Sequence, residues 1–346
     1  MANRKSQSAY RKSQIANRKS KIKNCKNNKR FAISNRQSTK IAVLMGGIGE
    51  ERDVSIQSGN CVAEALKKAG FNVVINDISP DNLDILEDAA IDIFFIALHG
   101  KFGEDGQLQQ ILEDKSLLYT GSGPTASRLA FDKIASKKVF EKNGVVTPKS
   151  ITFDEQADSE QLEKKLSRLG SKFVVKPATQ GSTIGVTIVN DPKSALADAR
   201  RCLDAFGDCI IEEYIAGREI TVGILENRAL PIIEIKTKTG FYDYQAKYLD
   251  EQTRFLFDTI DDPALIDKIS SDTVTCFNAL GCRHFARADF ILANDGTPYV
   301  LEINTIPGFT THSLLPMAAA KMGLSMSRLC TKIIEAAYSS LVKHQA

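Results

Sequence analysis

The sequence has no apolar run of the roughly 18 residues that a membrane-spanning helix needs. Its longest largely apolar stretch, Ile91 to Leu98, has only the length of a strand. We therefore expect no transmembrane segment. Hydrophobic residues make up 43% and charged residues 25% of the 346 positions, which is typical of a soluble globular chain with two or three compact units.

Cysteine patterns typical of metal or redox sites are also missing. None of the seven cysteines belongs to a C-x-x-C pair, and no histidine spacing beside them indicates zinc. An odd number of cysteines in a long chain favours reduced thiols and a cytoplasmic location. Most of the cysteines should therefore lie in the core as small apolar side chains.

Acidic residues are absent from the first forty positions, which hold 13 Lys or Arg. Residues 41–346 carry 32 basic and 42 acidic residues, so the net charge of +3 hides an acidic body and a basic tail. Three related heptads, at 3–9, 10–16 and 17–23, begin this tail. They offer too little apolar surface to offset the entropy of ordering, which predicts that residues 1–39 are disordered.

The favoured interpretation of the tail is an inert solvated segment. Three functional alternatives stay open. A basic arm binds nucleic acid, an acid-free Arg- and Ser-rich stretch is typical of transit peptides, and positive charge attracts anionic membranes. Low-complexity repeats favour the inert interpretation. We therefore expect neither a nucleic-acid nor a membrane partner.

Strands and helices alternate from Lys40 onward. Apolar runs predict strands at 41–45, 71–75 and 91–98, and helical spacing predicts a helix at 55–69. This βαβ order predicts a parallel open sheet in an N-terminal α/β domain, residues 40–122.

Two further α+β domains are predicted, a small central one over 123–216 and a C-terminal one over 217–346. The central domain should hold helices at 124–143 and 191–206 and strands at 173–176, 185–189 and 210–214. The C-terminal domain should hold strands at 219–225 and 230–235, a helix at 263–280, a hairpin and terminal helices. Segment 236–258 has no clean period, which is typical of a functional lid or of a disordered segment.

The hairpin places acidic residues opposite each other. Asp295-Gly296 is a strong turn signal, and centring the turn there pairs Asp289 with Glu302 and Arg287 with Asn304. The other face then holds Ala288, Phe290, Leu301 and Ile303. Opposed carboxylates repel, and either a shared proton or a divalent cation relieves the repulsion. The oxygen ligands here suit Mg²⁺. The equal alternative is a solvated face on which Arg287 neutralises the acids.

Two loops rich in small residues are candidates for nucleotide binding. Lys176–Gly185 (KPATQGSTIG) connects two predicted strands, and backbone N–H groups in such loops cradle phosphate, with Lys176 adding charge. It does not match the G-x-x-x-x-G-K-[ST] phosphate loop. Gly121–Ala126 matches the dinucleotide pattern G-x-G-x-x-A, but Pro124 favours a simple strand-to-helix turn.

Taken together and in order, several segments resemble the D-alanine–D-alanine ligase family of the ATP-grasp group, from about Lys40 to the C-terminus. The matching segments are 46–55 (GGIGEERDVS, with the Gly-Gly pair and ERDVS as the matching parts), 97–106, 131–133, 176–185, 211–219, 241–248 (FYDYQAKY) and 301–314 (LEINTIPGFTTHSL). Two departures occur: the family often has Ser just before the Glu51-Arg52 pair, and a second Ser where Thr183 stands. Both are conservative.

The resemblance implies an α/β ATP-grasp architecture with the N-terminal parallel-sheet domain, a central ATP-grasp subdomain and a C-terminal catalytic domain. It implies ATP-dependent joining of two D-alanine molecules through an acyl phosphate, for peptidoglycan precursor synthesis. ATP, two Mg²⁺ ions, for which Mn²⁺ can substitute, and a cytoplasmic homodimer are implied with it. Alternatives are a D-alanine–D-lactate or D-alanine–D-serine ligase, another ATP-grasp carboxylate–amine ligase, or a silent ATP-binding module.

The resemblance also implies roles for single residues. Catalytic roles fall to Glu51, Ser182, Tyr248, Arg287 and Gly308. The D-alanine substrates would contact His99, Ser313 and Leu314. ATP would contact Lys133, Lys176, Glu212, Tyr214, Ile215, Glu219 and Phe241. The metal ligands would be Asp289, Glu302 and Asn304. Depsipeptide-forming relatives tend to carry histidine near Tyr248, so the tyrosine favours D-alanine as acceptor.

Overall fold

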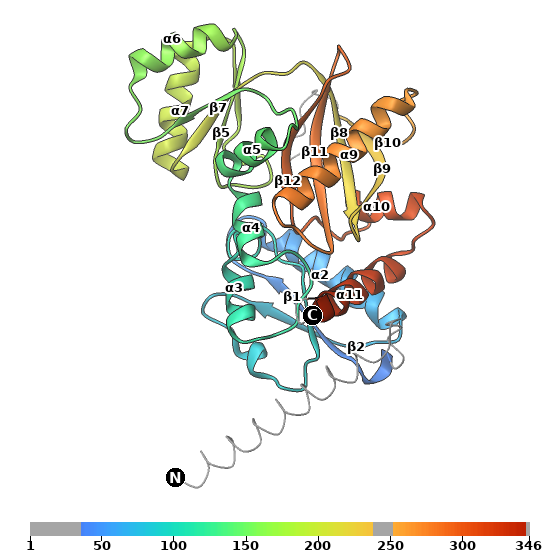
Figure 1. Ribbon diagram of the computed structural model, residues 1–346. Coiled ribbons are helices and arrows are strands. Elements are labelled where there is room, and N and C mark those ends of the chain that lie inside the picture. Colours follow the sequence, from blue (N-terminus) through green and yellow to red (C-terminus); the bar gives the residue numbers. More distant parts are fainter. Residues whose placement is uncertain (1–35, 238–251, 344–346) are drawn as a thin grey trace, which may run out of the picture. The chain divides into compact units, whose positions relative to one another are not determined.

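The computed structural model describes residues 36–237 and 252–343, which fall into two units (Figure 1). We call residues 36–103, 107–121 and 308–343 the first unit. The second unit comprises residues 104–106, 122–237 and 252–307. The C-terminal segment from Gly308 thus belongs to the same unit as the N-terminal strands.

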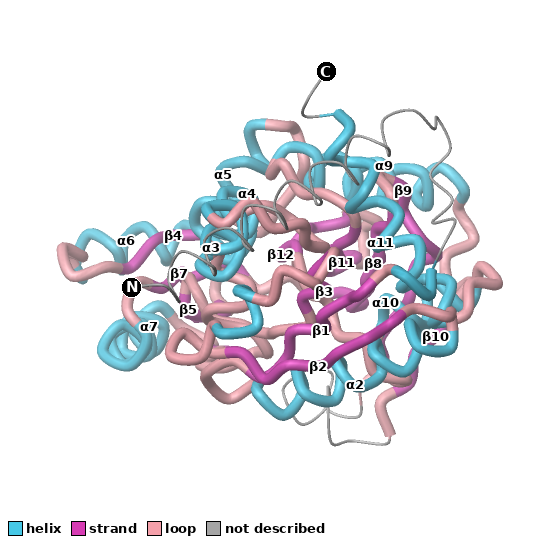
Figure 2. Tube along the Cα trace, turned by 90° about the horizontal axis from the view of Figure 1, so that it is seen from below, coloured by secondary structure: helices cyan, strands magenta, loops and turns pink. Residues whose placement is uncertain are grey.

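The first unit is built on the predicted parallel sheet. Strand β1 (Lys40–Gly46) lies between β2 (Asn72–Ile78) and β3 (Ile93–Ile96), and both pairings are parallel (Figure 2). The crossover helix α2 (Arg52–Lys68) packs on β1 and β2, and α11 (Met326–Lys343) packs on α2. Burial of β1 explains its continuous apolar run, since a central parallel strand meets no water on either face.

The remaining elements of the first unit are short. They are the 3₁₀ helices η1 (Arg36–Ser38) and η2 (Asp84–Glu87) and the α-helices α3 (Gln107–Asp114) and α10 (Leu314–Lys321). Arg36 donates to the carbonyl of Ala69 at 3.3 Å, and its guanidinium lies 5.6 Å from the centre of the Phe71 ring. Residues 36–38, which the sequence assigns to the tail, therefore pack on the body of the first unit.

Two antiparallel sheets make up the second unit. The four-stranded sheet has the order β4-β7-β5-β6, and helices α6 and α7 pack with it around one apolar core. Its elements are β4 (Ser150–Phe153), α6 (Ser159–Leu169), β5 (Phe173–Pro177), β6 (Thr187–Val189), α7 (Pro192–Phe206) and β7 (Cys209–Glu213). The sequence analysis did not predict β4 or α6, although Asp158 caps α6 by accepting from the N–H groups of Glu160 and Gln161.

The five-stranded sheet has the order β10-β9-β8-β11-β12. Its strands are β8 (Gly217–Leu225), β9 (Arg228–Lys236), β10 (Arg254–Leu256), β11 (Phe285–Ala293) and β12 (Pro298–Asn304). Helix α9 (Pro263–Ala279) contacts β8, β9 and β12. Together with α4 (Pro124–Phe131) and α5 (Lys133–Lys142) it closes the second apolar core of this unit.

The single helix predicted over 124–143 is wrong. The structure has two helices, α4 (Pro124–Phe131) and α5 (Lys133–Lys142), separated at Asp132. Asp132 has extended backbone angles, φ −87° and ψ 106°, and its Oδ1 accepts from the N–H groups of Ile134 and Ala135. An aspartate in this geometry starts a new helix, because it satisfies amides that have no partner in the first turn.

The hairpin pairs Asp289 with Glu302 and Arg287 with Asn304, as predicted. The predicted register fails nearer the turn, where Phe290 pairs with Val300 instead of Leu301. A bulge between Asp289 and Phe290 makes up the one-residue difference. Because of this bulge Leu301 lines a cavity beside Glu302 and does not join the core cluster that contains Ala288, Phe290 and Ile303.

Two expectations from composition can be compared with the structure. No helix within 36–237 and 252–343 combines the length and apolarity that crossing a bilayer requires. Six cysteines fall in these ranges, all as free thiols, and five of them are buried. The prediction that most cysteines are small core side chains is therefore confirmed.

Candidate active site

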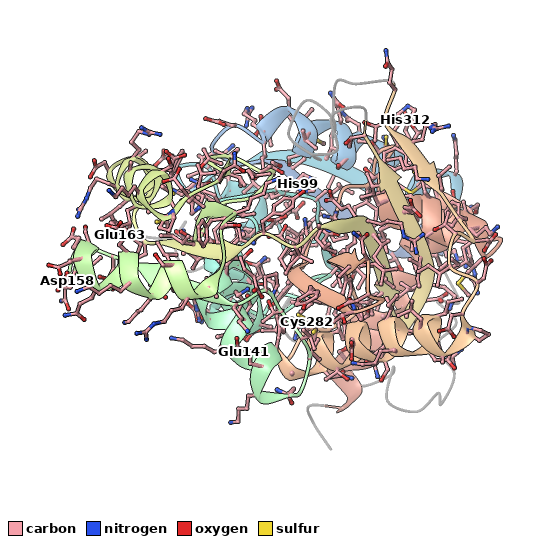
Figure 3. All side chains as sticks on the ribbon, turned by 90° about the horizontal axis from the view of Figure 1, so that it is seen from above. His99, Glu141, Asp158, Glu163, Cys282 and His312 are labelled. Atoms are coloured by element: carbon pink, nitrogen blue, oxygen red, sulfur yellow. The ribbon has the colours of Figure 1, made fainter. Side chains whose placement is uncertain are left out.

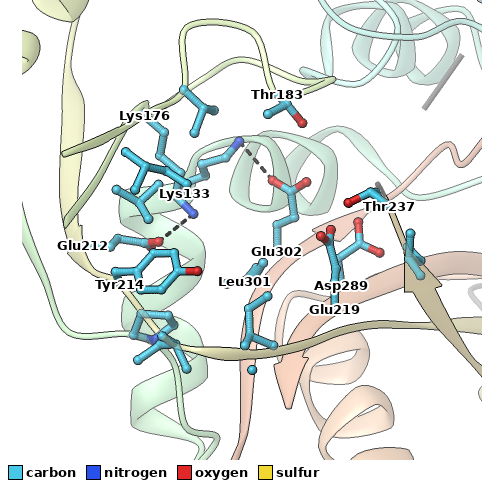
Figure 4. Close-up of a pocket in the computed structure, with 18 of the residues that line it drawn as sticks. Lys133, Lys176, Thr183, Glu212, Tyr214, Glu219, Thr237, Asp289, Leu301 and Glu302 are labelled. Atoms are coloured by element: carbon cyan, nitrogen blue, oxygen red, sulfur yellow. Dashed lines mark ion pairs between the residues drawn. The ribbon is translucent and has the colours of Figure 1, made fainter. Parts of the chain in front are cut away.

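A cavity of about 340 Å³ lies in the second unit and is lined by both of its sheets (Figure 4). Loop 178–186, between β5 and β6, contributes Gln180, Gly181 and Thr183 to the lining. Eight residues that the resemblance singles out also line it: Lys133, Lys176, Glu212, Tyr214, Ile215, Glu219, Asp289 and Glu302. Six of these side chains come from five different strands and one helix, and Tyr214 and Ile215 come from the connection between β7 and β8, so only the fold assembles them.

Lys133, the first residue of α5, ties the loop to the hairpin. Its backbone N–H donates to the carbonyl of Ala178 at 2.9 Å. Its Nζ donates to the carbonyl of Gln180 at 2.7 Å and lies 3.1 Å from Oε2 of Glu302. A cation beside a small-residue loop and a carboxylate is an arrangement that binds phosphate and its counter-ion.

Glu212 on β7 is buried between two lysines. Its Oε2 lies 2.8 Å from Nζ of Lys176, and its Oε1 lies 2.7 Å from Nζ of Lys137. Burial raises the pKa of Glu212, but the two ammonium groups outweigh burial and hold this pKa below its ordinary value. The carboxylate is therefore ionised at neutral pH.

The sequence analysis did not single out Lys137, whose side chain is 3% exposed. Its one available signal is its spacing of four residues from Lys133, which places both lysines on one side of α5. That spacing does not distinguish a buried lysine from a solvated one. Only its contact with Glu212 in the folded chain marks Lys137 as part of this region.

Apolar side chains also line the cavity, among them Val174, Ile188, Ile215 and Ile291. The ring of Tyr214 lies there with Nζ of Lys172 3.7 Å from its centre. Glu219 and Glu234 line the same cavity, and Glu234 pairs with Arg218 and Lys236. An apolar slot bordered by a few fixed carboxylates suits a nucleobase and its ribose.

The predicted metal ligands lie on the paired strands β11 and β12. Arg287 holds Asp289 by two bonds, Nε to Oδ1 at 2.8 Å and Nη2 to Oδ2 at 2.6 Å. Thr221 on β8 donates to the same Oδ1 at 2.6 Å. Glu302 pairs instead with Lys133, so each carboxylate has its own cationic partner.

These residues fit a hard divalent cation by their donor chemistry. Asp289 and Glu302 occupy directly paired positions and line the same cavity. Asn304 accepts from the N–H of Ile306 at 3.0 Å, which leaves a second lone pair on its Oδ1. Within the described ranges no cluster of three or more His, Cys, Asp or Glu is gathered for a metal, so the set depends on the amide and on ligand oxygens.

Three other predicted site residues, Ser182, Phe241 and Tyr248, are not among the described residues that line the cavity. Ser182 follows Gly181 in the loop and has the left-handed backbone angle φ 50°, but it is not among the lining residues. Phe241 and Tyr248 lie outside the described residues, as does most of the predicted lid at 236–258.

A second cluster of predicted residues lies in the first unit. Glu51 immediately precedes α2, and a Cβ on Gly100 would stand 2.5 Å from its Oε2. His99 is buried, in contrast to the exposed His312 (Figure 3), and its Nε2 lies 3.2 Å from Oγ of Ser58. The same Oγ accepts the N–H of Phe309 at 3.2 Å.

Gly308, Ser313 and Leu314 belong to this second cluster. A Cβ at Gly308 would stand 2.6 Å from Oγ of Ser313. That Oγ accepts the N–H of Thr310 at 2.9 Å and so folds the 308–313 loop back on itself. Leu314 begins α10 and is buried. Ser58, which the sequence analysis missed, links this loop to His99; nothing in its helical position distinguishes it from a small core residue.

The chain resembles known proteins along most of its length. Residues 139–335 match the family model described as the D-ala D-ala ligase C-terminus. The D-alanine–D-alanine ligase from Syntrophotalea carbinolica is 42% identical to this chain, over 87% of this chain and 97% of the relative. The D-alanine–D-alanine ligase from Bordetella avium is also 42% identical, over 85% of this chain and 93% of the relative.

Solved structures agree with these relatives. The D-alanine–D-alanine ligase from Bacillus anthracis complexed with ATP is 34% identical, with a TM-score of 0.76 over 89% of this chain and 100% of that one. The VanG D-Ala:D-Ser ligase from Enterococcus faecalis is 28% identical, also with a TM-score of 0.76, over 87% and 100%. With a match of this extent in sequence and in structure, the chain belongs to the D-alanine–D-alanine ligase family.

Proposed function

We propose that this chain joins two D-alanine molecules at the expense of ATP. The observation that carries the proposal is the cavity that Lys133, Lys176, Asp289 and Glu302 all line, in a chain similar to an ATP-bound ligase. Positive side chains for phosphates, oxygen ligands for a divalent cation and an apolar slot for a base are what a nucleotide requires.

The reaction must activate a poor electrophile. A carboxylate resists attack by an amine because its leaving group would be oxide. Transfer of the γ-phosphoryl group to the carboxylate of the first D-alanine gives ADP and an acyl phosphate. The amine nitrogen of the second D-alanine, after losing a proton, attacks the carbonyl carbon, and inorganic phosphate leaves as the C–N bond forms. The products are D-alanyl-D-alanine, ADP and phosphate.

The nucleotide is held by residues of the second unit. Lys133 and Lys176 bind its phosphates, while Tyr214, Ile215, Glu212 and Glu219 surround its base and ribose, as does Phe241. Asp289, Glu302 and Asn304 would hold two Mg²⁺ ions, for which Mn²⁺ could substitute. The ions supply charge neutralisation for the transferring phosphoryl group.

The two D-alanine molecules are held by the remaining predicted residues. Glu51 and His99 bind the first one, and Ser313 and Leu314 bind the second. Arg287 and the N–H of Gly308 donate to the oxygen that becomes negative during attack, a contribution of about 3 kcal/mol per donor. Ser182 and Tyr248 are the remaining catalytic residues that the family resemblance implies. Support for these roles is the resemblance together with the burial of Glu51 and His99.

The product is a peptidoglycan precursor, so we also propose a cytoplasmic enzyme of cell wall synthesis. The family resemblance supports the further proposal that the enzyme works as a homodimer.

The decisive assay couples phosphate release to ATP turnover with D-alanine as the sole amino acid, with L-alanine as control. We expect phosphate, ADP and D-alanyl-D-alanine in equal amounts, identified by mass spectrometry. ATP turnover without dipeptide would overturn the proposal.

A D-serine or D-lactate acceptor is the second candidate, because the similar VanG protein is a D-Ala:D-Ser ligase. A D-alanine acceptor arrives as an ammonium ion, and a neutral tyrosine with a pKa of about 10 does not repel it. Tyr248 therefore favours the dipeptide. Equal D-alanine, D-serine and D-lactate offered from pH 6 to 8.5 should give mainly D-alanyl-D-alanine. A predominance of either other product at neutral pH would move the chain to the second candidate.

A further inference from the structure

Lys137 is a buried lysine whose three donors all have partners. Its Nζ donates to Oγ1 of Thr147 at 2.9 Å, to the carbonyl of Pro148 at 2.6 Å and to Oε1 of Glu212 at 2.7 Å. An ammonium group has three N–H donors and no acceptor, so these three oxygens fit its charged form. Burial lowers the pKa of Lys137, and the Glu212 carboxylate opposes that shift.

Lys137 stands behind the cavity wall. Glu212 and Lys176 line the cavity, and Lys137 does not. Glu212 takes one lysine on each carboxylate oxygen, Lys137 on Oε1 and Lys176 on Oε2. With both lysines the three side chains carry a net charge of +1. Without Lys137, the charges of Glu212 and Lys176 cancel.

We propose that Lys137 is a positioning residue that neutralises Glu212 from behind the wall and so leaves the charge of Lys176 to the nucleotide phosphates. The inference rests on the proposed function, because it takes ATP as the ligand of this cavity. Lys137 also fixes the carboxylate through Oε1, which directs Oε2 toward Lys176. All three side chains are buried, so the loss of one charge acts strongly on the other two.

A comparison of ATP with adenosine separates this role from a merely structural one. Adenosine occupies the apolar slot but has no phosphate. In Lys137→Met, whose side chain is similar in length and uncharged, the affinity for ATP should fall about tenfold or more, while that for adenosine changes less than about twofold. The KM for D-alanine should stay as in the unmodified enzyme. Lys138→Met, the exposed neighbour on α5, is the matched control and should change neither affinity.

Two further variants complete a charge series and cover the case in which Lys137→Met does not fold. Glu212→Gln leaves two lysines and a net charge of +2. Lys137→Met combined with Glu212→Gln leaves Lys176 alone, with a net charge of +1 and no unpaired buried carboxylate. The ratio of ATP affinity to adenosine affinity should be highest in Glu212→Gln, and equal within about threefold in the double variant and the unmodified enzyme. It should be lowest in Lys137→Met.

Isothermal titration of each full-length variant measures both affinities. A ratio that does not follow the net charge, or ATP and adenosine affinities that fall together, would overturn the positioning role. An unmodified enzyme that binds no ATP would instead refute the proposed function. An enzyme that binds ATP and keeps its ratio through the whole series refutes this inference alone.

Discussion

At the scale of single residues, Asp289 is held by hydrogen bonds from two side chains. Arg287 and Thr221 both donate to its Oδ1, and Arg287 also donates to Oδ2. In Asp289→Asn the amide keeps the shape but loses the charge that holds a cation. We expect turnover to fall by about a hundredfold or more at ordinary Mg²⁺ concentrations. Asp295→Asn, at the exposed turn of the same hairpin, is the control. Near-normal turnover in Asp289→Asn would remove this residue from the metal site.

His284 predicts a pH dependence of stability. Burial, aided by Arg283, lowers its pKa from 6.5 to about 3, so the folded state disfavours the protonated ring. Its contribution to stability is full above pH 6.5 and is lost as the pH falls toward 3, because the unfolded chain binds the proton more readily. Between pH 7 and 4.5 the unmodified enzyme should lose about 2 kcal/mol more unfolding free energy than His284→Asn.

Asparagine is the replacement for His284 because it tolerates the left-handed backbone angle of 69° at this position. His312→Asn, at an exposed position, should leave the pH dependence as it is. Melting temperatures across this pH range measure the difference. Parallel curves for the unmodified enzyme and His284→Asn would show that burial of this ring does not govern the pH dependence.

At the scale of elements, the cap at Asp132 determines where α5 begins and therefore where Lys133 stands. Asp132→Ala removes the acceptor of the Ile134 and Ala135 N–H groups and should cost about 1 kcal/mol of unfolding free energy. It should also raise the KM for ATP, since Lys133 is the next residue. Asparagine caps helices as well as aspartate does, so Asp132→Asn should preserve both properties. Equal losses in the two variants would show that charge, not capping, matters at this position.

The β-bulge in the hairpin has a comparable local effect. Between the turn and the bulge, the strand pairing is shifted by one residue from the predicted register. The bulge restores the predicted register, so that Asp289 pairs with Glu302. It also turns Leu301 toward the cavity of the second unit. A bulge has no reliable sequence signal, because the extra residue carries no required side chain.

At the scale of the whole molecule, residues 1–35 should be dispensable. They are rich in Lys and Arg and have few large apolar side chains, so they add little to any core. A chain that begins at Arg36 keeps the contacts of Arg36 with Ala69 and Phe71 and should retain its melting temperature and kinetic constants. A chain that begins at Lys40 loses these contacts and is the comparison. A large loss of activity on removal of 1–35 alone would assign a function to the basic segment.

The sequence by itself determined the elements with strong local signals. The apolar run of β1, the helical spacing of α2 and the Asp295-Gly296 turn predicted the parallel sheet and the hairpin, because each signal lies within a few neighbouring residues. The joint order of the motifs determined the family. The break at Asp132 was missed because the apolar spacing continues across it, although an aspartate cap was visible.

The tertiary structure alone decided which side chains meet. Lys137 and Glu212 are 75 residues apart, and Ser58 and Phe309 are 251 apart. Periodicity shows which face of an element is buried but not which element covers it. Whether a buried lysine meets a carboxylate depends on how α5 packs near β7, and that packing is a property of the whole core rather than of either segment.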